Sequence, residues 1–207
     1  MSYQLLRTSL DTQKIVRAEY IEMKGQSIVG MSTTRERVED DFYATPTGSV
    51  IQLLTREEII YPAWECACGD GAIAKLLKGD VLATDLIDRG YGQGGVDFLT
   101  TEPDKEIKTV ITNPPFNLFT EFLERGLEMA KEKLILFGKL QALEGEKRAT
   151  ILENTPLKVV YVFKKRQSPL RNGSPVDEKG KPWASTMAFA WFVWEKGFVG
   201  EPVIRWI

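Results

Sequence analysis

Hydrophobic and polar positions settle into a regular rhythm from about residue 60 to the end of the chain. Short apolar runs rich in β-branched and aromatic residues predict buried strands at 59–67, 80–86, 106–113, 133–139, 157–166 and 186–197. Segments with apolar residues three or four positions apart predict helices at 50–58, 72–79, 117–133 and 141–154. The pattern therefore indicates strands that alternate with helices.

Such alternation is typical of an α/β protein with a doubly wound, mostly parallel sheet. The last two predicted strands, 157–166 and 186–197, are joined by a loop rich in Pro and Gly and not by a helix. We therefore expect them to form an antiparallel C-terminal hairpin at one edge of the sheet. Residues 200–207 are expected to form only a terminal segment.

The beginning of the chain follows no clear period. We interpret residues 1–40 as a partly ordered N-terminal extension, with short strands around Lys14–Tyr20. Turn residues between Pro46 and Gly48 then introduce the regular part of the chain. Residues 41–207 are long enough to form one domain with a substantial core.

The charge of the whole chain is nearly balanced, with 27 Lys and Arg residues against 29 Asp and Glu residues. This balance is not that of a generally basic nucleic-acid-binding protein, although a local basic patch would suffice. The densest patch lies in the loop 164–184 and contains Lys164, Lys165, Arg166 and Arg171. It is either a solvated loop or a contact with nucleic acid.

The chain has no histidine and two cysteines, and this excludes several kinds of catalytic site. Neither a Ser-His-Asp nor a Cys-His arrangement can form, and a zinc site with four Cys and His ligands is excluded. Catalysis would have to use carboxylates, amides, backbone groups, aromatic rings and a cofactor. Cys66 and Cys68 are poorly spaced for a disulfide, so we expect reduced packing residues.

No apolar run approaches the roughly 20 residues that a membrane-spanning helix needs. The first residues, MSYQLLRTSLDTQK, lack the apolar region of a secretory signal peptide. We therefore expect a cytoplasmic protein that does not enter a membrane.

The stretch TVITNPPFN, residues 109–117, combines a strand end, a stiff turn and a helix start. Pro114 and Pro115 cannot donate hydrogen bonds, so the strand must stop there, and their fixed φ angles stiffen the turn. Ligands of open α/β sheets bind at the carboxyl ends of strands. The Asn113 side-chain oxygen and the Pro114 carbonyl could accept the hydrogens of an exocyclic amine, while Phe116 stacks on the base that carries it.

Two further strand ends carry residues that suit a nucleoside. The sequence WECACGDGAIAKLL predicts a strand, a glycine-containing turn and a helix start, whose free N–H groups can bind an anionic group such as a carboxylate. Asp85 ends the next strand and could accept two hydrogen bonds from a ribose diol. Asp97 could accept from an adenine amine, with Phe98 or Leu99 as an apolar wall. Each of these residues would also suit an ordinary turn or core position.

The ordered set DFYATP, ECACGDG, ATDL, GGVDFL and TNPPF resembles class I S-adenosylmethionine-dependent amino-methyltransferases that act on nucleic-acid bases. It is most similar to the short DNA adenine-N6 methylases of phages and prophages. The resemblance covers residues 41–207 and implies the Rossmann-like sheet of class I methyltransferases. It also implies S-adenosyl-L-methionine as the cofactor, no metal, and duplex DNA with a flipped-out target base as the partner.

The resemblance assigns a role to each matching residue. Asp85 would hold the ribose of the cofactor, and Asp97 and Phe98 would hold its adenine. The catalytic loop would consist of Asn113, Pro114, Pro115 and Phe116. The residues that border or cover the methionine end would be Glu65, Cys66, Gly69, Gly71, Phe42, Tyr43, Thr45 and Pro46.

The order of the motifs resembles that of enzymes whose target-recognition region follows the catalytic loop. Here about 90 residues follow TNPPF, and most are needed to complete the sheet. Recognition would then come from the loop 164–184, the N-terminal extension or a second subunit, so a homodimer stays open. The side chains that could hold an opened strand are Lys164, Lys165, Arg166, Arg171 and Trp183.

Other substrates and one non-enzymatic function stay open. Cytosine N4 presents the same exocyclic amine geometry as adenine N6. RNA bases and protein glutamine side chains also present planar NH₂ groups. A catalytically silent protein with this fold could serve as a scaffold, but the intact TNPPF sequence and Asp85 argue against that alternative.

Overall fold

The structure is a computed structural model that describes residues 42–167, 170–171, 180 and 187–207. The chain divides into two units, Met1–Val38 and Glu39–Ile207, and all described residues belong to the second. The predicted strands around Lys14–Tyr20 and most of the loop 164–184 therefore lie outside the described residues.

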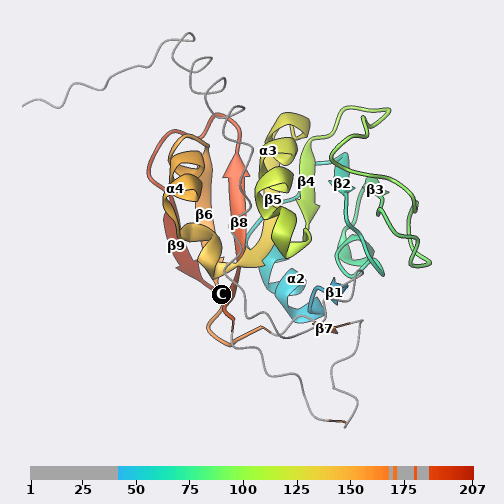
Figure 1. Cartoon of the computed structure of the whole chain (residues 1–207), viewed down its shortest axis with the longest axis horizontal. Coiled ribbons are helices and arrows are strands. Elements are labelled where there is room, and N and C mark those ends of the chain that lie inside the picture. Colours follow the sequence, from blue (N-terminus) through green and yellow to red (C-terminus); the bar gives the residue numbers. More distant parts are fainter. Residues whose placement is uncertain (1–41, 168–169, 172–179, 181–186) are drawn as a thin grey trace, which may run out of the picture. The chain divides into compact units, whose positions relative to one another are not determined.

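A seven-stranded mixed sheet forms the centre of the described domain (Figure 1). Its strands are, in spatial order, β3 (Val81–Ala83), β2 (Ala63–Glu65), β4 (Thr109–Thr112), β5 (Lys133–Lys139), β8 (Phe189–Glu195), β6 (Leu157–Val162) and β9 (Val203–Trp206). The first four pair in parallel, β8 runs antiparallel to both of its neighbours, and β9 pairs in parallel with β6. This arrangement confirms the predicted doubly wound sheet, mostly parallel with an antiparallel C-terminal hairpin.

The hairpin of β6 and β8 does not lie at the edge of the sheet, as we had expected. Strand β8 is inserted between β5 and β6, and the edge is formed by β9, from the segment expected to be merely terminal. Residues 189–194 of β8 are all buried, which requires a neighbouring strand on each side and cover on both faces. All four residues of β9 are exposed, which suits an edge strand.

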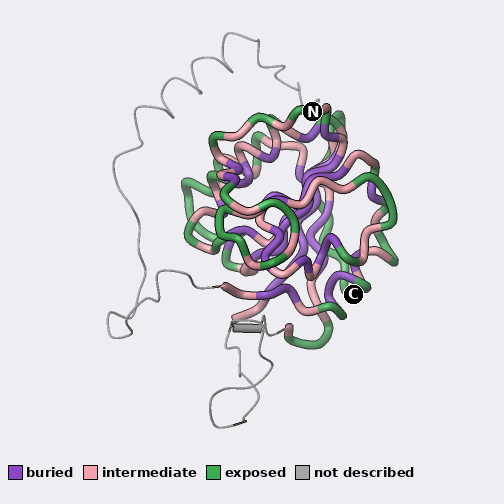
Figure 2. Tube along the Cα trace, turned by 90° about the vertical axis from the view of Figure 1, so that its right-hand side faces the viewer, coloured by how far each residue is buried: buried purple, intermediate pink, exposed green. Residues whose placement is uncertain are grey.

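Helices cover both faces of the sheet. Because successive strand residues point to opposite faces, each strand contributes to two separate core layers. Leu134 packs in the layer of α3 (Phe119–Met129) and Ile135 in the layer of α2 (Thr47–Leu54). Helix α4 (Glu146–Glu153) adds partly buried residues to the α3 layer. Figure 2 shows the buried trace running through the middle of the domain, with exposed segments around it.

Three of the four predicted helices are present with changed bounds. The helix predicted at 50–58 is α2, which begins three residues earlier, and that predicted at 117–133 is the shorter α3. A 3-10 turn, η2 (Phe116–Leu118), precedes α3. The segment predicted as one helix at 141–154 is split into η3 (Leu140–Leu143) and α4. Gly145 lies between them at φ 103°, a conformation that a helix cannot continue through.

The prediction of a helix at residues 72–79 is wrong. Only a 3-10 turn, η1 (Ala74–Leu76), forms there. The Ala74 N–H, which an α-helix would direct to the carbonyl four residues earlier, donates instead to the buried Glu65 carboxylate at 2.7 Å. Leu77 is already extended, so the chain proceeds directly toward β3.

A second, two-stranded sheet joins segments that the sequence did not predict to pair. Strand β1 (Tyr43–Ala44) lies antiparallel to β7 (Leu170–Arg171), with Tyr43 opposite Arg171. The DFYATP segment is therefore tied to the loop that carries the basic residues.

No helix in the described part of the chain is long and apolar enough to cross a bilayer.

A buried ion pair secures the amino end of β5. The Lys133 ammonium lies 2.8 Å from the Glu57 carboxylate, and both side chains are less than one tenth exposed. The Tyr161 hydroxyl donates to the other Glu57 oxygen at 2.7 Å. Each of these buried charges is paired within the protein, so neither is available to a ligand. Ligands of open α/β sheets bind at the opposite, carboxyl end of the strands.

Candidate functional site

Four parallel strands bring the sequence-predicted residues to one edge of the sheet. Strands β2, β3, β4 and β5 run in the same direction, so their carboxyl ends lie side by side. The strand ends carry the predicted Glu65 on β2, Asp85 just beyond β3 and Asn113 just after β4. They also carry Lys139 on β5, which was not predicted from the sequence. This is the edge at which open α/β sheets bind ligands.

The turn after β2 is tied to the end of β3 through Asp85. One Asp85 carboxylate oxygen accepts the Gly69 N–H at 2.7 Å, and the other accepts the Ile87 N–H at 2.9 Å. Gly69 and Gly71 have φ angles of 55° and 81°, which side-chain-bearing residues rarely adopt. Glycine therefore occupies the two positions of this turn, the glycine turn of Gly69 and Gly71, that have positive φ angles. The hydrogen bond from Gly69 to Asp85 holds the turn against the end of β3.

Glu65 supports this turn from within the core. Its side chain is 1% exposed, and its carboxylate accepts the Ala74 N–H. Burial raises its pKa well above the usual value, and the nearby Asp70 and Asp85 charges add to that rise. In this structure Glu65 lies against the η1 backbone, beneath the turn.

Two aromatic rings lie directly on the glycines of the turn. A Cβ atom at Gly69 would overlap the Phe42 ring, and one at Gly71 would overlap the Tyr91 ring. The Arg89 guanidinium carbon lies 4.6 Å from the Phe42 ring centroid. Tyr91 and Arg89 were not singled out from the sequence; their position in a loop rich in glycine was the signal available.

The GGVDFL segment is placed against the end of β3. The Val96 N–H donates to the Asp85 carbonyl at 3.0 Å, and the Asp97 carboxylate accepts the Leu99 N–H at 3.0 Å. Phe98 is 2% exposed and packs edge-on against Trp64, so its ring belongs to the core. The half-buried Asp97 and Leu99 form the more accessible part of this segment.

Asn113 is held in one orientation by the DFYATP segment. Its Nδ2 atom donates to the Tyr43 carbonyl at 2.9 Å. Its Oδ1 atom is buried and has no hydrogen-bond partner among the described residues. No described residue donates to the Pro114 carbonyl either. The loop thus offers two hydrogen-bond acceptors that the structure leaves unused.

Phe116 stands at the centre of an aromatic group beside this loop. Its ring centroid lies 5.4 Å from that of Tyr43 and 5.5 Å from that of Phe189. The Lys139 ammonium lies over the Phe116 ring, 4.6 Å from its centroid. Pro114 is buried and Pro115 is exposed, so the chain passes from the core to the surface between these two residues.

The DFYATP segment connects the two halves of the site. Phe42 contacts the glycine turn, and the next residue, Tyr43, contacts both Asn113 and Phe116. Thr45 is buried, and the Pro46 carbonyl accepts the Ser49 hydroxyl at 2.7 Å at the start of α2. One short segment therefore spans the glycine turn and the loop after β4.

The basic residues after β6 lie only partly within the described chain. Lys164, Lys165 and Arg166 are exposed, and Arg171 is paired through its backbone in β7. Trp183 lies outside the described residues. Strands β5 and β6 both run antiparallel to β8, so the residues after β6 lie at the same edge as Lys139.

Both thiols are free and buried, as the sequence predicted. Burial raises the pKa of Cys66 well above its ordinary value and that of Cys68 to about 12. The Cys68 thiol lies 3.4 Å from the Tyr91 carbonyl, beside the glycine turn. A thiol of this kind is not a nucleophile at neutral pH.

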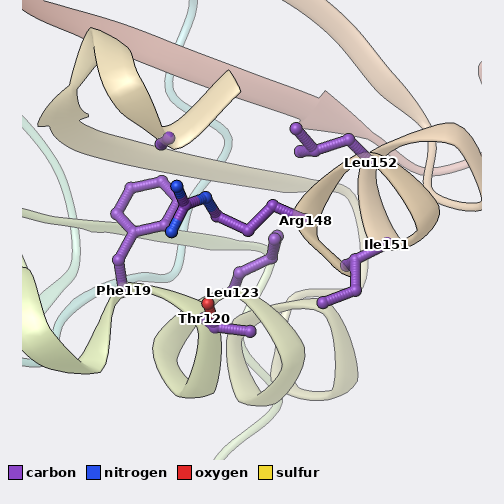
Figure 3. Close-up of a pocket in the computed structure, with 7 residues that line it drawn as sticks. Phe119, Thr120, Leu123, Arg148, Ile151 and Leu152 are labelled. Carbon is purple, nitrogen blue, oxygen red and sulfur yellow. The ribbon is translucent and has the colours of Figure 1, made fainter. Parts of the chain in front are cut away.

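A small cavity lies apart from these residues, between α3 and α4 (Figure 3). It is lined by Phe119, Thr120, Leu123, Ala142, Arg148, Ile151 and Leu152. Its volume of about 10 Å³ is no more than a single water molecule needs. It is a packing defect of the core and not a ligand site.

Within the described residues, no group of three or more Cys, Asp or Glu side chains could hold a metal ion.

Comparison with known proteins gives a match in structure only. No protein-family model matches this chain, and no curated protein matches it significantly in sequence. The methyltransferase subunit of a type I restriction-modification system from Streptococcus thermophilus superimposes with a TM-score of 0.54 at 12% identity. That match covers 80% of this chain and 47% of the subunit.

Two further solved structures have a similar fold. A Listeria monocytogenes protein assigned to the class I S-adenosylmethionine-dependent methyltransferases gives a TM-score of 0.52 at 14% identity, over 95% of this chain and 72% of its own. The 23S rRNA methyltransferase ErmE gives 0.51 at 15% identity, over 77% and 73%. The chain therefore has the Rossmann-like fold of class I methyltransferases, and spans about half (47%) of the Streptococcus thermophilus subunit.

Proposed function

We propose that this chain is an S-adenosylmethionine-dependent methyltransferase that acts on the exocyclic N6 amine of adenine in DNA. The observation that carries the proposal is the buried Oδ1 atom of Asn113, which has no partner among the described residues and lies in a turn stiffened by two prolines. Burying a hydrogen-bond acceptor without a partner costs free energy unless a ligand supplies the donor. An exocyclic amine has the two hydrogens that Asn113 and the Pro114 carbonyl can accept.

The residues around the glycine turn fit the proposed cofactor. Asp70 Oδ1 is buried without a partner among the described residues, and would accept from the ammonium of the cofactor's methionine end. The Asp85 carboxylate accepts two backbone N–H bonds and keeps further lone pairs for a ribose diol. At Gly69 and Gly71 the Phe42 and Tyr91 rings occupy the space that a Cβ atom would need, so these rings lie against the turn beside Asp70.

The chemistry divides between the cofactor and this chain. S-adenosylmethionine supplies an electrophilic methyl group on a sulfonium sulfur. Asn113 and the Pro114 carbonyl orient the amine and favour a tetrahedral nitrogen, whose lone pair is then free to attack. Phe116 stacks on the target base, and Tyr43 keeps the Asn113 amide from rotating. After transfer the nitrogen can lose its proton to solvent, so the chain needs no histidine base.

Several features support a nucleic acid as the substrate. Aromatic rings and lysines gather at the carboxyl edge, where Phe116, Tyr43 and Lys139 meet. Exposed Lys164 and Lys165 follow β6 at the same edge. An adenine must leave the base stack to reach Asn113, and the aromatic group offers a surface for the flipped base.

The test is methyl transfer from labelled S-adenosylmethionine to unmethylated DNA, with nucleoside analysis of the product. We expect N6-methyladenine from the parent and none from Asn113→Ala. Asn117→Ala is the matched control, because Asn117 is an exposed asparagine in η2 of the same loop. We expect it to retain activity.

The same assay separates the alternatives. N4-methylcytosine in the product would move the target to cytosine. Labelled RNA or labelled protein glutamine, with DNA unlabelled, would keep the chemistry and overturn the DNA substrate. No transfer to any of the three, with no binding of S-adenosylmethionine, would overturn the proposed enzyme in favour of a silent scaffold.

A further inference from the structure

Lys139 lies at the carboxyl edge of the sheet, and none of the motifs found in the sequence includes it. It is the last residue of β5, so it lies at the carboxyl edge, next to the end of β4. Its ammonium lies 4.6 Å from the centroid of the Phe116 ring. That contact places a positive charge directly beside the loop that contains Asn113.

This charge has no counter-ion in the described part of the chain. No described carboxylate lies within 4.0 Å of the Lys139 nitrogen, and burial lowers the pKa of the half-buried ammonium. Lys133, at the other end of the same strand, lies 2.8 Å from Glu57 and 3.8 Å from Glu195. A partly desolvated cation that contacts a ring but has no anionic partner among the described residues is suited to an anionic ligand.

The topology argues against the cofactor as that ligand. The glycine turn and Asp85 follow β2 and β3, whereas Lys139 ends β5, on the far side of β4 and Asn113. Within the proposed function, the substrate lies on that far side. A nucleotide substrate carries a phosphate close to its base, whereas a protein glutamine carries no anion.

We propose that Lys139 binds a phosphate of the strand that carries the target base, and so selects a nucleic acid over a protein amide. This inference rests on the proposed function. The flexible four-carbon stem lets the ammonium move to a phosphate while the stem stays beside Phe116. Exposed Lys164 and Lys165, at the same edge, extend the positive charge along the path of the strand.

The experiment compares Lys139→Met with Lys131→Met. Lys131 is an exposed lysine two residues before β5, at the opposite edge of the sheet, and serves as the matched control. The affinity for DNA is measured against salt concentration. Loss of one phosphate contact should reduce the magnitude of the log–log slope by about 0.9 for a duplex, or about 0.7 for a single strand. Lys131→Met should leave the slope unchanged, and Lys139→Arg should restore it.

Kinetics and a modified substrate give independent readouts. In Lys139→Met we expect the KM for DNA to rise about 10-fold, with cofactor affinity unchanged and kcat less affected. A single-adenine oligonucleotide with neutral methylphosphonate linkages around the adenine should bind the parent more weakly than the natural strand does. Lys139→Met should discriminate between the two strands less than the parent does.

The outcomes distinguish this inference from the proposed function. Equal salt slopes and equal methylphosphonate discrimination in the parent and Lys139→Met, with N6-methyladenine still formed, would overturn only the role of Lys139. Absence of any methylated base from the parent reaction would overturn the proposed function whatever the slopes. A melting temperature close to that of the parent shows that Lys139→Met is folded.

Discussion

The Asn113 side-chain amide donates to the Tyr43 carbonyl at 2.9 Å, a hydrogen bond that spans 70 residues of sequence. It fixes the orientation of an amide whose Oδ1 atom is buried and has no partner in the part of the chain that the structure describes. It also joins the DFYATP segment to the loop after β4. The same segment contacts the glycine turn through Phe42, so the two parts of the proposed site are mechanically connected.

Asn113→Asp tests this hydrogen bond with almost no change in shape. A carboxylate cannot donate to the Tyr43 carbonyl, and the two oxygens would repel each other. We expect methyl transfer to fall by about 10²–10³-fold, the scale of losing one oriented polar group at a reaction centre. Labelled-methyl transfer to DNA measures the effect, with Asn117→Asp as the control. Retention of parental kcat in Asn113→Asp would contradict a role for the Tyr43 contact.

Gly69→Ala tests the close approach of Phe42 to the turn. Gly69 has φ 55°, and its added methyl group would overlap the Phe42 ring. Backbone strain should lower the free energy of unfolding by about 1–3 kcal/mol, and the overlap with the Phe42 ring should add to that loss. Gly48→Ala is the matched control, because Gly48 lies in α2 and a Cβ there would have no neighbour within 4 Å. That control should gain up to about 1 kcal/mol. Urea unfolding of both variants measures the difference, and equal stabilities would contradict the prediction.

Tyr161 makes stability depend on pH in the alkaline range. Burial, and then its hydrogen bond to Glu57, raise the pKa of Tyr161 to about 12 in the folded protein, from 10.0. The unfolded chain therefore loses this proton at lower pH than the folded one. The stabilisation is complete below about pH 10 and is lost as pH rises from about 10 to about 12.

The comparison of the parent with Tyr161→Phe isolates this contribution from other titrating groups. Urea unfolding across the alkaline range should show a steeper loss of stability in the parent than in the variant. Parallel curves for the two proteins would show that Tyr161 titrates alike in the folded and unfolded states.

The two thiols should resist alkylation while the protein is folded. Cys66 is 2% and Cys68 3% exposed, and burial raises both pKa values, that of Cys68 to about 12. Since only the thiolate reacts, iodoacetamide near pH 8 should modify neither residue without denaturant and both in its presence. Mass spectrometry of the intact protein measures the number of adducts. Rapid modification of Cys68 in the folded protein would show that the glycine turn opens.

Local signals in the sequence were sufficient for most strands. The run KLILFGK was predicted at 133–139, and β5 has those bounds, because apolar β-formers between charged ends leave little choice. The helix predicted at 72–79 failed, because the distant Glu65 carboxylate takes the Ala74 N–H. A side chain nine residues away competes with the helical carbonyl only once the strand containing it is buried.

The loop 164–184 and the DFYATP segment show a different limit. The sequence predicted that Lys164, Lys165 and Arg166 lie in a solvated loop or contact nucleic acid; they are exposed in the structure, and the contact stays a prediction. The pairing of Leu170–Arg171 with Tyr43–Ala44 gave no sequence signal, because each strand is two residues long. Strand pairing over such a short length depends on how the flanking chain is positioned.

The sequence alone determined the alternation of strands and helices, the glycine turn, the acidic strand ends and the stiff TNPPF turn, because each depends on neighbouring residues. Only the tertiary structure placed β8 between β5 and β6 and laid the Phe42 and Tyr91 rings on the glycines. It alone brought Lys139 to Phe116 and joined Asn113 to Tyr43. These relationships link residues far apart in the chain, and they form when burial of the sheet brings its carboxyl ends to one edge.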